Sequence, residues 1–246
     1  MISNGKFYES QFEEATIELL REAHWQYAFG DDIHRKYTDP LIEEDLRNFL
    51  AVQYKDKNLT TSEMDSIVAN LRNTGGQNDY YALRNTFLLY RDGYDFAYSD
   101  GRSNPFRLEY IDFEHPDHNI FRCVNQFVME QGRENRRPDI LLFINGIPVC
   151  IIELKNPTKQ NATIRDAHTQ ICTRYMRDIP ALLKYCALAV ISDGAKNALG
   201  ATYTPFEFFY EWKKIENEDK AGKGLDTLRT LIRGALSPER ILEILR

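Results

Sequence analysis

The chain has 246 residues, of which 43% are hydrophobic, 28% charged and 12% aromatic. These proportions are typical of a soluble globular protein and exclude a mainly disordered chain. The longest apolar stretches, residues 147–152 and 186–191, are far shorter than the roughly 18 residues that a membrane helix needs, and no secretion signal precedes the first predicted helix. We therefore expect a cytoplasmic protein with no membrane span.

Charge is distributed unevenly along the chain. The formal net charge is −6, yet residues 132–184 contain nine Lys or Arg residues and only five Asp or Glu residues. A basic segment in an acidic chain is typical of a protein that meets an anionic partner at one place. Solvated charges on helix faces would give the same count.

Hydrophobic spacing predicts helices first and strands later. Apolar residues recur at helical spacing in the first third, and from Tyr94 onwards aromatic and β-branched residues alternate. A strand, a helix and another strand then follow in the order of a crossover unit. The predicted helices are 9–27, 41–53, 61–73, 79–91 and 163–177, with two more in 225–246, and the predicted strands are 94–98, 106–113, 120–130, 139–144, 148–155 and 185–192.

The most informative stretch runs from Arg137 to Lys155. Two apolar runs meet at Asn145-Gly146, the strongest short signal for a β-hairpin. The second run ends in Glu153 and Lys155, which strand alternation places on one face. A strand this apolar is expected in the centre of a sheet.

The register of this hairpin decides whether Asp139 faces Glu153. A two-residue turn would place Asp139 opposite Ile152 and leave the two carboxylates on opposite sides of the sheet. A three-residue loop that includes Ile147 would place Asp139 opposite Glu153, with Gly146 in the left-handed conformation of a bulge. We expect the three-residue loop, which would put the two Cβ atoms roughly 5 Å apart.

Two carboxylates at this separation, with Lys155 beside them, have the chemistry that phosphodiester hydrolysis needs. They can hold one Mg²⁺, and an ammonium can orient a water molecule or stabilise the developing charge. A structural ion cluster would explain either acid alone. Both acids together at the end of a buried strand need a partner that offsets their desolvation, which favours a metal-dependent nuclease.

These residues resemble a known motif. Arg137-Pro138-Asp139 and Glu153-Leu154-Lys155, with thirteen residues between Asp139 and Glu153, resemble the motif of the PD-(D/E)xK nucleases. The wider context resembles the N-terminal domain of the restriction (R) subunit of type I restriction-modification enzymes. This likeness covers nearly the whole chain in five ordered blocks: residues 119–127, 137–148, 152–157, 177–180 and 191–194.

The resemblance implies an α/β fold, a mixed central β-sheet flanked by helices with a restriction-endonuclease-like core and a helical N-terminal part. It implies a Mg²⁺-dependent endonuclease domain at 1–212, which cuts double-stranded DNA without sequence preference of its own. A polar linker at 213–224 would precede the helical start of an ATP-driven motor at 225–246, where the pattern stops in mid-helix as though the natural chain continues. The whole enzyme would include methylation and specificity subunits. The sequence has no phosphate-binding Gly-x-x-x-x-Gly-Lys-Ser/Thr motif, so ATP is expected only in the motor.

Site roles follow from the same resemblance. Asp139 and Glu153 would bind the metal, and Lys155 would be catalytic. An acid on the first helix often joins the metal site of this fold, and Glu14 is the candidate, with a solvated helix face as the alternative.

Gln170 is a further catalytic candidate. Many members of the family carry a Gln and a Tyr four residues apart on the helix after the motif, but here Gln170 and Tyr175 are five apart. On an ideal helix this spacing turns the two side chains about 140° away from each other. Either the helix contains a π-bulge or only one of the two serves the site, and we expect Gln170 to lie near the metal.

The remaining candidates are basic and imidazole side chains. His115 and His118 lie three residues apart in a Pro-containing turn with no second ligand pair nearby, so no metal site is expected there. Two rival functions remain, a catalytically silent docking module and a free-standing repair nuclease. The candidate phosphate contacts, which could also be merely solvated, are Lys159, Arg165, Arg174 and Arg177.

Overall fold

A six-stranded mixed sheet forms the centre of the computed structural model, which describes residues 4–155, 163–215 and 224–246. The pairs β1–β4 and β8–β9 are parallel and the other neighbours are antiparallel. In sheet order the strands are β1 (Gln26–Phe29), β4 (Phe121–Asn125), β7 (Ile140–Ile144), β8 (Ile147–Leu154), β9 (Leu188–Ser192) and β10 (Asn197–Ala201).

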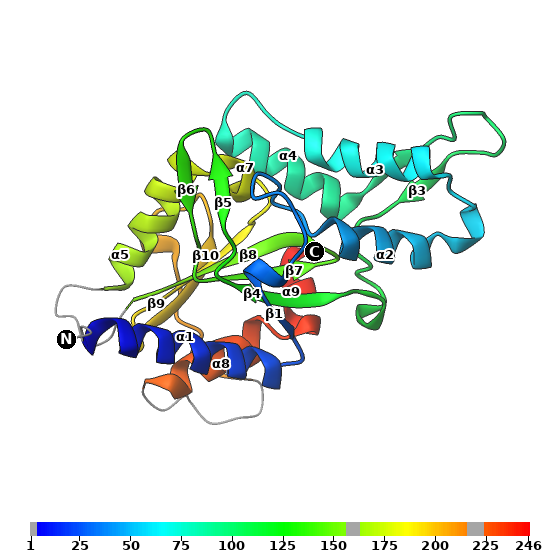
Figure 1. The fold of residues 1–246 in the computed structure, drawn as a ribbon. Helices are drawn as coiled ribbons and strands as arrows, with labels where there is room; N and C mark the ends of the chain where they lie inside the picture. Colours follow the sequence, from blue (N-terminus) through cyan, green and yellow to red (C-terminus); the bar gives the residue numbers. More distant parts are fainter. Residues whose placement is uncertain (1–3, 156–162, 216–223) are drawn as a thin grey trace.

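Helices cover both faces of this sheet, as Figure 1 shows. On one face, α1 (Asn4–Glu22) packs beside α8 (Leu225–Ala235), which is followed by α9 (Pro238–Leu245). On the other face lies a helical stretch made of α5 (Ile164–Thr169), the π-helix Gln170–Tyr175, α6 (Met176–Asp178) and α7 (Pro180–Leu183). The arrangement is the mixed α/β fold that was predicted.

A separate group of helices lies beside the sheet: α2 (Glu43–Gln53), α3 (Thr61–Asn73) and α4 (Asp79–Asp92). Two small hairpins complete the fold, β2–β3 (Tyr94–Phe96 and Phe106–Leu108) and β5–β6 (Met129–Gln131 and Glu134–Arg136). Within the described ranges, every helix is too short or too polar to serve as a membrane span.

The central strands β7 and β8 are buried along their whole length. Leu142 and Ile152 belong to the cluster on the α1 side, whereas Leu141 and Ile151 belong to the cluster beneath α5. A strand covered on both faces needs a continuous apolar run, which is the pattern of this segment. Side chains at the strand ends are therefore held by a rigid frame.

Several predicted elements agree with the structure and several do not. Helix α3 has the predicted bounds and begins with a capping box between Thr60 and Glu63. The first helix was predicted to reach Tyr27, but it ends at Glu22 because His24 has a left-handed φ of 70° and the chain enters β1. The predicted strand 120–130 is two strands, and β6 and β10 were not predicted.

The β7–β8 hairpin corrects the expected loop. Its turn has two residues, because Ile144 pairs with Ile147, and Asn145 and Gly146 have φ values of 50° and 75°. The pairing then steps from Phe143–Pro148 to Leu142–Cys150, which leaves Val149 as the extra residue of a β-bulge. The three-residue loop was therefore wrong, whereas the positive φ of Gly146 is confirmed.

The bulge still brings the two acids together. Beyond it Ile140 pairs with Ile152, so the next position along places Asp139 across from Glu153. One extra residue shifts side-chain alternation by one position wherever it is inserted, in the loop or in the strand. The inference about the two carboxylates held although the position of the extra residue was wrong.

Helices α8 and α9 share the hydrophobic cluster of α1. The indole Nε1 of Trp25 donates a 2.7 Å hydrogen bond to the carbonyl of Leu236. The predicted linker before them, 213–224, lies mostly outside the described residues.

Candidate active site

The sequence motif converges at the open end of the β7–β8 hairpin. Asp139 lies directly before β7, Glu153 is the last but one residue of β8, and Lys155 follows that strand. Glu153 is only 1% exposed, and the Lys155 side chain is 15% exposed. The backbone N–H of Leu154 donates a 2.7 Å hydrogen bond to Oδ2 of Asp139, which fixes that carboxylate against the neighbouring strand.

A closed ring of hydrogen bonds joins four side chains, those of Glu153, Lys155, Gln170 and Tyr175. Lys155 Nζ donates to Oε1 of Glu153 at 2.7 Å and to Oε1 of Gln170 at 2.6 Å. Gln170 Nε2 donates to the hydroxyl of Tyr175 at 2.7 Å, and that hydroxyl donates to Oε2 of Glu153 at 3.2 Å. Each member therefore holds its neighbours in place, including the lysine.

The π-helix explains how Gln170 and Tyr175 both reach this ring. It spans these two residues and contains one extra residue per turn, so positions five apart come onto one face. The structure thus has the π-bulge, the first of the two alternatives left open by the spacing. Gln170 lies where it was expected, and Tyr175 lies there as well.

Burial and mutual repulsion shape the electrostatics of the two carboxylates. Burial raises the pKa of Asp139 well above its ordinary value, and the neighbouring Glu153 raises it further. Burial, together with the charge of Glu153, also raises the pKa of Tyr175, so its hydroxyl stays protonated and can donate. The repulsion between the two carboxylates gives Asp139 a tendency to take up a proton, or a cation in its place.

The donor set fits a hard divalent cation. Carboxylate oxygens are the ligands that Mg²⁺ prefers. Asp139 uses Oδ2 for the Leu154 N–H, and no donor among the described residues is paired with its Oδ1. The residues that would hold the ion are thus Asp139 and Glu153, which lie opposite each other on adjacent strands.

The acid of the first helix that faces this site is Glu13, not Glu14. Glu13 accepts hydrogen bonds from Asn125 Nδ2 at 2.7 Å and Gln126 Nε2 at 2.9 Å, and its charge contributes to the raised pKa of Asp139. Glu14 is exposed. The spacing of apolar residues could have predicted Glu13, which shares its helix face with the buried Ile17. Glu14 lies four residues before an exposed glutamate and therefore on the solvent face.

The candidate phosphate contacts lie on the helical stretch that carries Gln170. Arg165 is exposed, pairs with Glu207 at 3.6 Å and lies over the ring of Phe206. Arg177 is exposed and pairs with Asp178 at 2.6 Å. Arg174 is exposed too. Lys159 lies outside the described residues.

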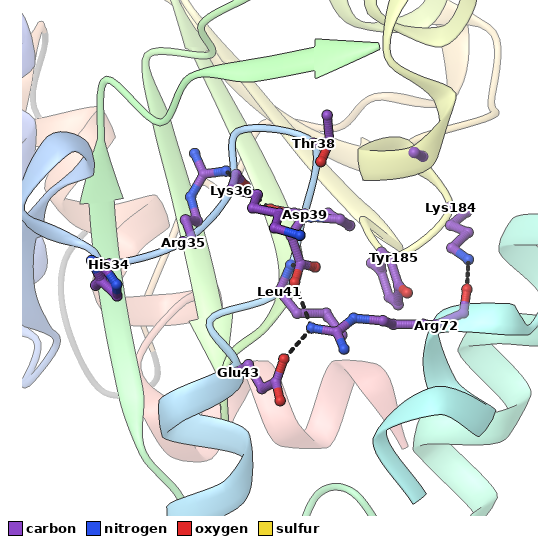
Figure 2. Close-up of a pocket in the computed structure, with 12 residues that line it drawn as sticks. His34, Arg35, Lys36, Thr38, Asp39, Leu41, Glu43, Arg72, Lys184 and Tyr185 are labelled. Atoms are coloured by element: carbon purple, nitrogen blue, oxygen red, sulfur yellow. Dashed lines mark hydrogen bonds and ion pairs between the residues drawn. The ribbon is translucent and has the colours of Figure 1, made fainter. Parts of the chain in front are cut away.

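A cavity of about 750 Å³ lies elsewhere, between the segment 34–43, Arg72 and residues 181–185, and Figure 2 shows its lining. None of the three motif residues lines it. Arg72 lies between the carboxylates of Asp39 and Glu43, and Lys184 Nζ donates to the carbonyl of Arg72 at 2.6 Å. These charges are paired within the protein, so the acid pair and not this cavity is the candidate active site.

Comparison with known proteins identifies the family to which the chain belongs. Residues 6–208 match the family described as the N terminus of the type I restriction enzyme R protein. The chain belongs to this family, as its motif had indicated.

Individual relatives carry the corresponding names. The chain is 31% identical to the type I restriction enzyme HindI endonuclease subunit of Haemophilus influenzae over 97% of its length. It is 28% identical to the putative MjaIXP endonuclease subunit of Methanocaldococcus jannaschii over 95% of its length. These alignments cover 23% and 24% of the two relatives, so the chain spans about a quarter of their length.

Proposed function

We propose that this chain is a Mg²⁺-dependent endonuclease domain that hydrolyses double-stranded DNA. The observation that carries the proposal is the placement of Asp139 opposite Glu153, with Lys155 bonded to Glu153. Endonuclease subunits among its relatives support the same reading. The whole enzyme would contain an ATP-driven motor and methylation and specificity subunits as partners.

Each residue of the site has a defined task in this proposal. Asp139 and Glu153 hold the cation, which when bound would neutralise phosphate charge and lower the pKa of a bound water. Lys155 stabilises negative charge that develops on the phosphate or orients the attacking water. Gln170 accepts a hydrogen bond from the Lys155 ammonium and so fixes its position, and Tyr175 fixes the second oxygen of Glu153.

The exposed basic residues of the Gln170 helix are proposed contacts to the phosphate backbone. Arg165, Arg174 and Arg177 are exposed on this helical stretch. Lys159, which lies outside the described residues, is proposed as a fourth contact. Phosphate contacts fix a protein on DNA without reading its sequence. Recognition of a particular DNA site is accordingly assigned to a partner subunit.

The extent of the catalytic domain is also a proposal. We place the endonuclease domain at 1–212 as the sequence suggested. However, α1 packs against α8, and Trp25 bonds to Leu236 between α8 and α9. These contacts favour including residues 225–246 in the endonuclease domain, so that the motor would begin later in the chain.

A plasmid-cleavage assay of the assembled enzyme tests the nuclease assignment. Lys155→Ala and Asp139→Ala should each lower the cleavage rate by at least about 10²–10³-fold, because each removes a group that acts on the developing charge. ATP hydrolysis, measured in parallel as phosphate release, should be largely unchanged. Loss of both activities in a folded, assembled variant would contradict the separation of nuclease and motor.

Calorimetric titration with Ca²⁺ tests the metal site separately, and the chain offers a matched pair of variants. Glu13→Gln should weaken binding because Glu13 adds negative charge near Asp139, whereas Glu14→Gln should leave it unchanged. Asp139→Asn and Glu153→Gln should abolish it. A protein that binds no divalent ion through these residues would be a docking module instead of a nuclease.

A further inference from the structure

Three metal-ligating side chains converge in the loop between β3 and β4, outside the candidate active site. Nδ1 of His118 lies 2.9 Å and Nδ1 of His115 lies 3.3 Å from Oδ2 of Asp112. One ligand atom from each of the three residues lies within 4.8 Å of the others. The sequence alone revealed only the two imidazoles, because nothing marked Asp112 as their neighbour.

Backbone geometry explains why the two imidazoles lie together. Residues 116–118 form a 3₁₀-helix that begins after His115, and residues three apart lie one above the other in such a helix. The two rings are accordingly stacked, with centroids 4.8 Å apart and planes at 22°. Both present Nδ1 to the same carboxylate oxygen.

Hydrogen bonds within the protein hold the Asp112 carboxylate in place without a metal ion. Oδ1 of Asp112 accepts hydrogen bonds from the N–H groups of Glu114 at 3.0 Å and His115 at 2.9 Å. Oδ2 accepts a third from Gln53 Nε2 at 3.1 Å. Asp112 is 5% exposed, while the side chains of His115 and His118 are 65% and 53% exposed. One anchored ligand thus faces two ligands that are open to solvent.

The distances match a small coordination sphere. Two ligands bound at about 2.0 Å to a tetrahedral ion are about 3.3 Å apart, close to the separations seen between Asp112 and each imidazole. Two imidazoles and a carboxylate, with a solvent molecule as fourth ligand, form a common zinc set. Imidazole nitrogen favours Zn²⁺, Co²⁺ or Ni²⁺ over Mg²⁺, which prefers oxygen.

We propose that Asp112, His115 and His118 form a second metal site that binds a transition-metal dication such as Zn²⁺. It lies at the turn end of the β7–β8 hairpin, since Asn119 Oδ1 accepts hydrogen bonds from both the Asp112 N–H and Asn145 Nδ2. The acid pair lies at the other end, five residues of β7 away, or roughly 16 Å at about 3.3 Å per residue. The ion clamps the 112–118 loop beside α2, the helix that supplies Gln53.

Titration of the metal-stripped 246-residue chain with CoCl₂ tests this site, because tetrahedral Co²⁺ absorbs visible light. The titration is run in excess Mg²⁺ and repeated with Glu153→Gln, so that the acid pair does not contribute. We expect one Co²⁺ that Zn²⁺ displaces, with affinity lowered at least about 10-fold by His115→Ala or His118→Ala. The exposed His34 supplies the control, and His34→Ala should bind as the unaltered chain does.

The outcomes separate this site from the proposed nuclease. Unchanged Co²⁺ binding in His118→Ala, or no Co²⁺ binding by the unaltered chain, would overturn the second site and leave the acid pair untouched. Loss of Co²⁺ binding in Glu153→Gln would show that the ion sits at the acid pair instead. A thermal melt with and without ZnCl₂ gives an independent reading, because an ion that binds only the folded state raises its melting temperature. That rise should be absent in both His→Ala variants.

Discussion

The two ends of the β7–β8 hairpin both contain buried polar side chains, but they differ in charge: the turn end holds a neutral amide and the open end holds two carboxylates. At the turn end, Asn145 Nδ2 donates to the carbonyl of Tyr110 at 3.0 Å, and its Oδ1 accepts from the N–H of Ile120 at 2.7 Å. At the open end, Asp139 lies across from Glu153, and Lys155 donates hydrogen bonds to Glu153 and to Gln170.

This difference distinguishes a structural polar group from a functional one. A buried amide whose donors and acceptors are all paired stabilises the fold and needs no ligand. Two buried carboxylates that face each other repel one another, and a bound cation or proton relieves that repulsion. The same hairpin therefore provides rigidity at one end and the candidate binding site at the other.

Gly146→Ala tests the rigid end and should have the largest effect on stability. A Cβ at Gly146 would lie 2.1 Å from the carbonyl oxygen of Ile42, and its φ of 75° is unfavourable for any residue with a side chain. The free energy of unfolding should fall by about 3–5 kcal/mol, measured by urea denaturation.

Gly132→Ala is the matched control for backbone strain alone. Gly132 also has a positive φ, of 63°, but a Cβ there would meet nothing within 4 Å. Its cost should be only about 1 kcal/mol. Equal losses in the two variants would mean that the contact with Ile42 does not matter.

Asn145→Gly should have the next largest effect. Glycine keeps the left-handed turn, so the variant removes only the side-chain hydrogen bonds and leaves the Ile120 N–H and the Tyr110 carbonyl without them. We expect a loss of about 2–3 kcal/mol in urea denaturation. Asn58→Gly is the control, because Asn58 is left-handed with a φ of 50° but exposed, and it should be nearly neutral. Similar values for both would refute the structural role of the Asn145 amide.

Tyr175→Phe probes the open end. It removes the hydroxyl that donates to Oε2 of Glu153, and a hydrogen bond to a charged group contributes about 1.5–3 kcal/mol. We expect the metal-free protein to lose about 1.5–2 kcal/mol of stability, at the low end of that range because the bond is 3.2 Å long. In a Glu153→Gln background the loss of stability should be smaller. A double-mutant cycle that shows no coupling between Tyr175 and Glu153 would contradict the hydrogen-bonded ring.

Asp139→Asn should have the smallest effect and the most informative sign. The pKa of Asp139 is raised in the folded protein. Asp139 therefore contributes favourably to the free energy of unfolding below the ordinary carboxyl pKa of about 3.9. This contribution is lost as the pH rises towards the pKa that Asp139 has in the folded protein. At neutral pH in EDTA the free energy of unfolding of the variant should therefore equal that of the unaltered protein or exceed it by about 1 kcal/mol.

Added metal should reverse this order. Millimolar Mg²⁺ or Ca²⁺ stabilises only a folded state that keeps both ligands, so the unaltered protein should gain and Asp139→Asn should not. Thermal melts with EDTA and with each metal measure both effects. Strong destabilisation of the variant in EDTA, with equal gains from metal, would make Asp139 a structural polar group like the Asn145 amide and contradict the contrast between the two ends.

Local patterns predicted much of this protein because the relevant forces act over a few residues. The capping box at Thr60 and Glu63 marks the start of α3, and the apolar run of β8 marks a central strand. The pairing of Asp139 with Glu153 followed from counting alternation along the hairpin. The two acids and the lysine were thus recognised without a structure.

Other features depend on contacts between residues far apart in the chain. The extra residue lies in the bulge at Val149 and not in the loop, and the two-residue turn docks on α2 through a hydrogen bond from the Ile42 N–H to the Gly146 carbonyl. Glu13 and not Glu14 faces Asp139 because the packing of α1 sets its rotation. A sequence pattern defines the faces of a helix only coarsely, and one residue shifts a side chain by about 100°.

The sequence by itself therefore determined the fold class, the family and the motif residues, because hydrophobic period and motif spacing are local properties. Beyond Gln170, which the resemblance had already suggested, the tertiary structure alone decided which other side chains join them. It brought Tyr175 to Glu153 through a π-helix and Asp112 to the two imidazoles through a 3₁₀-helix. The physical reason is that a site is defined by distances of about 3 Å, which depend on backbone irregularities and packing that no local pattern encodes.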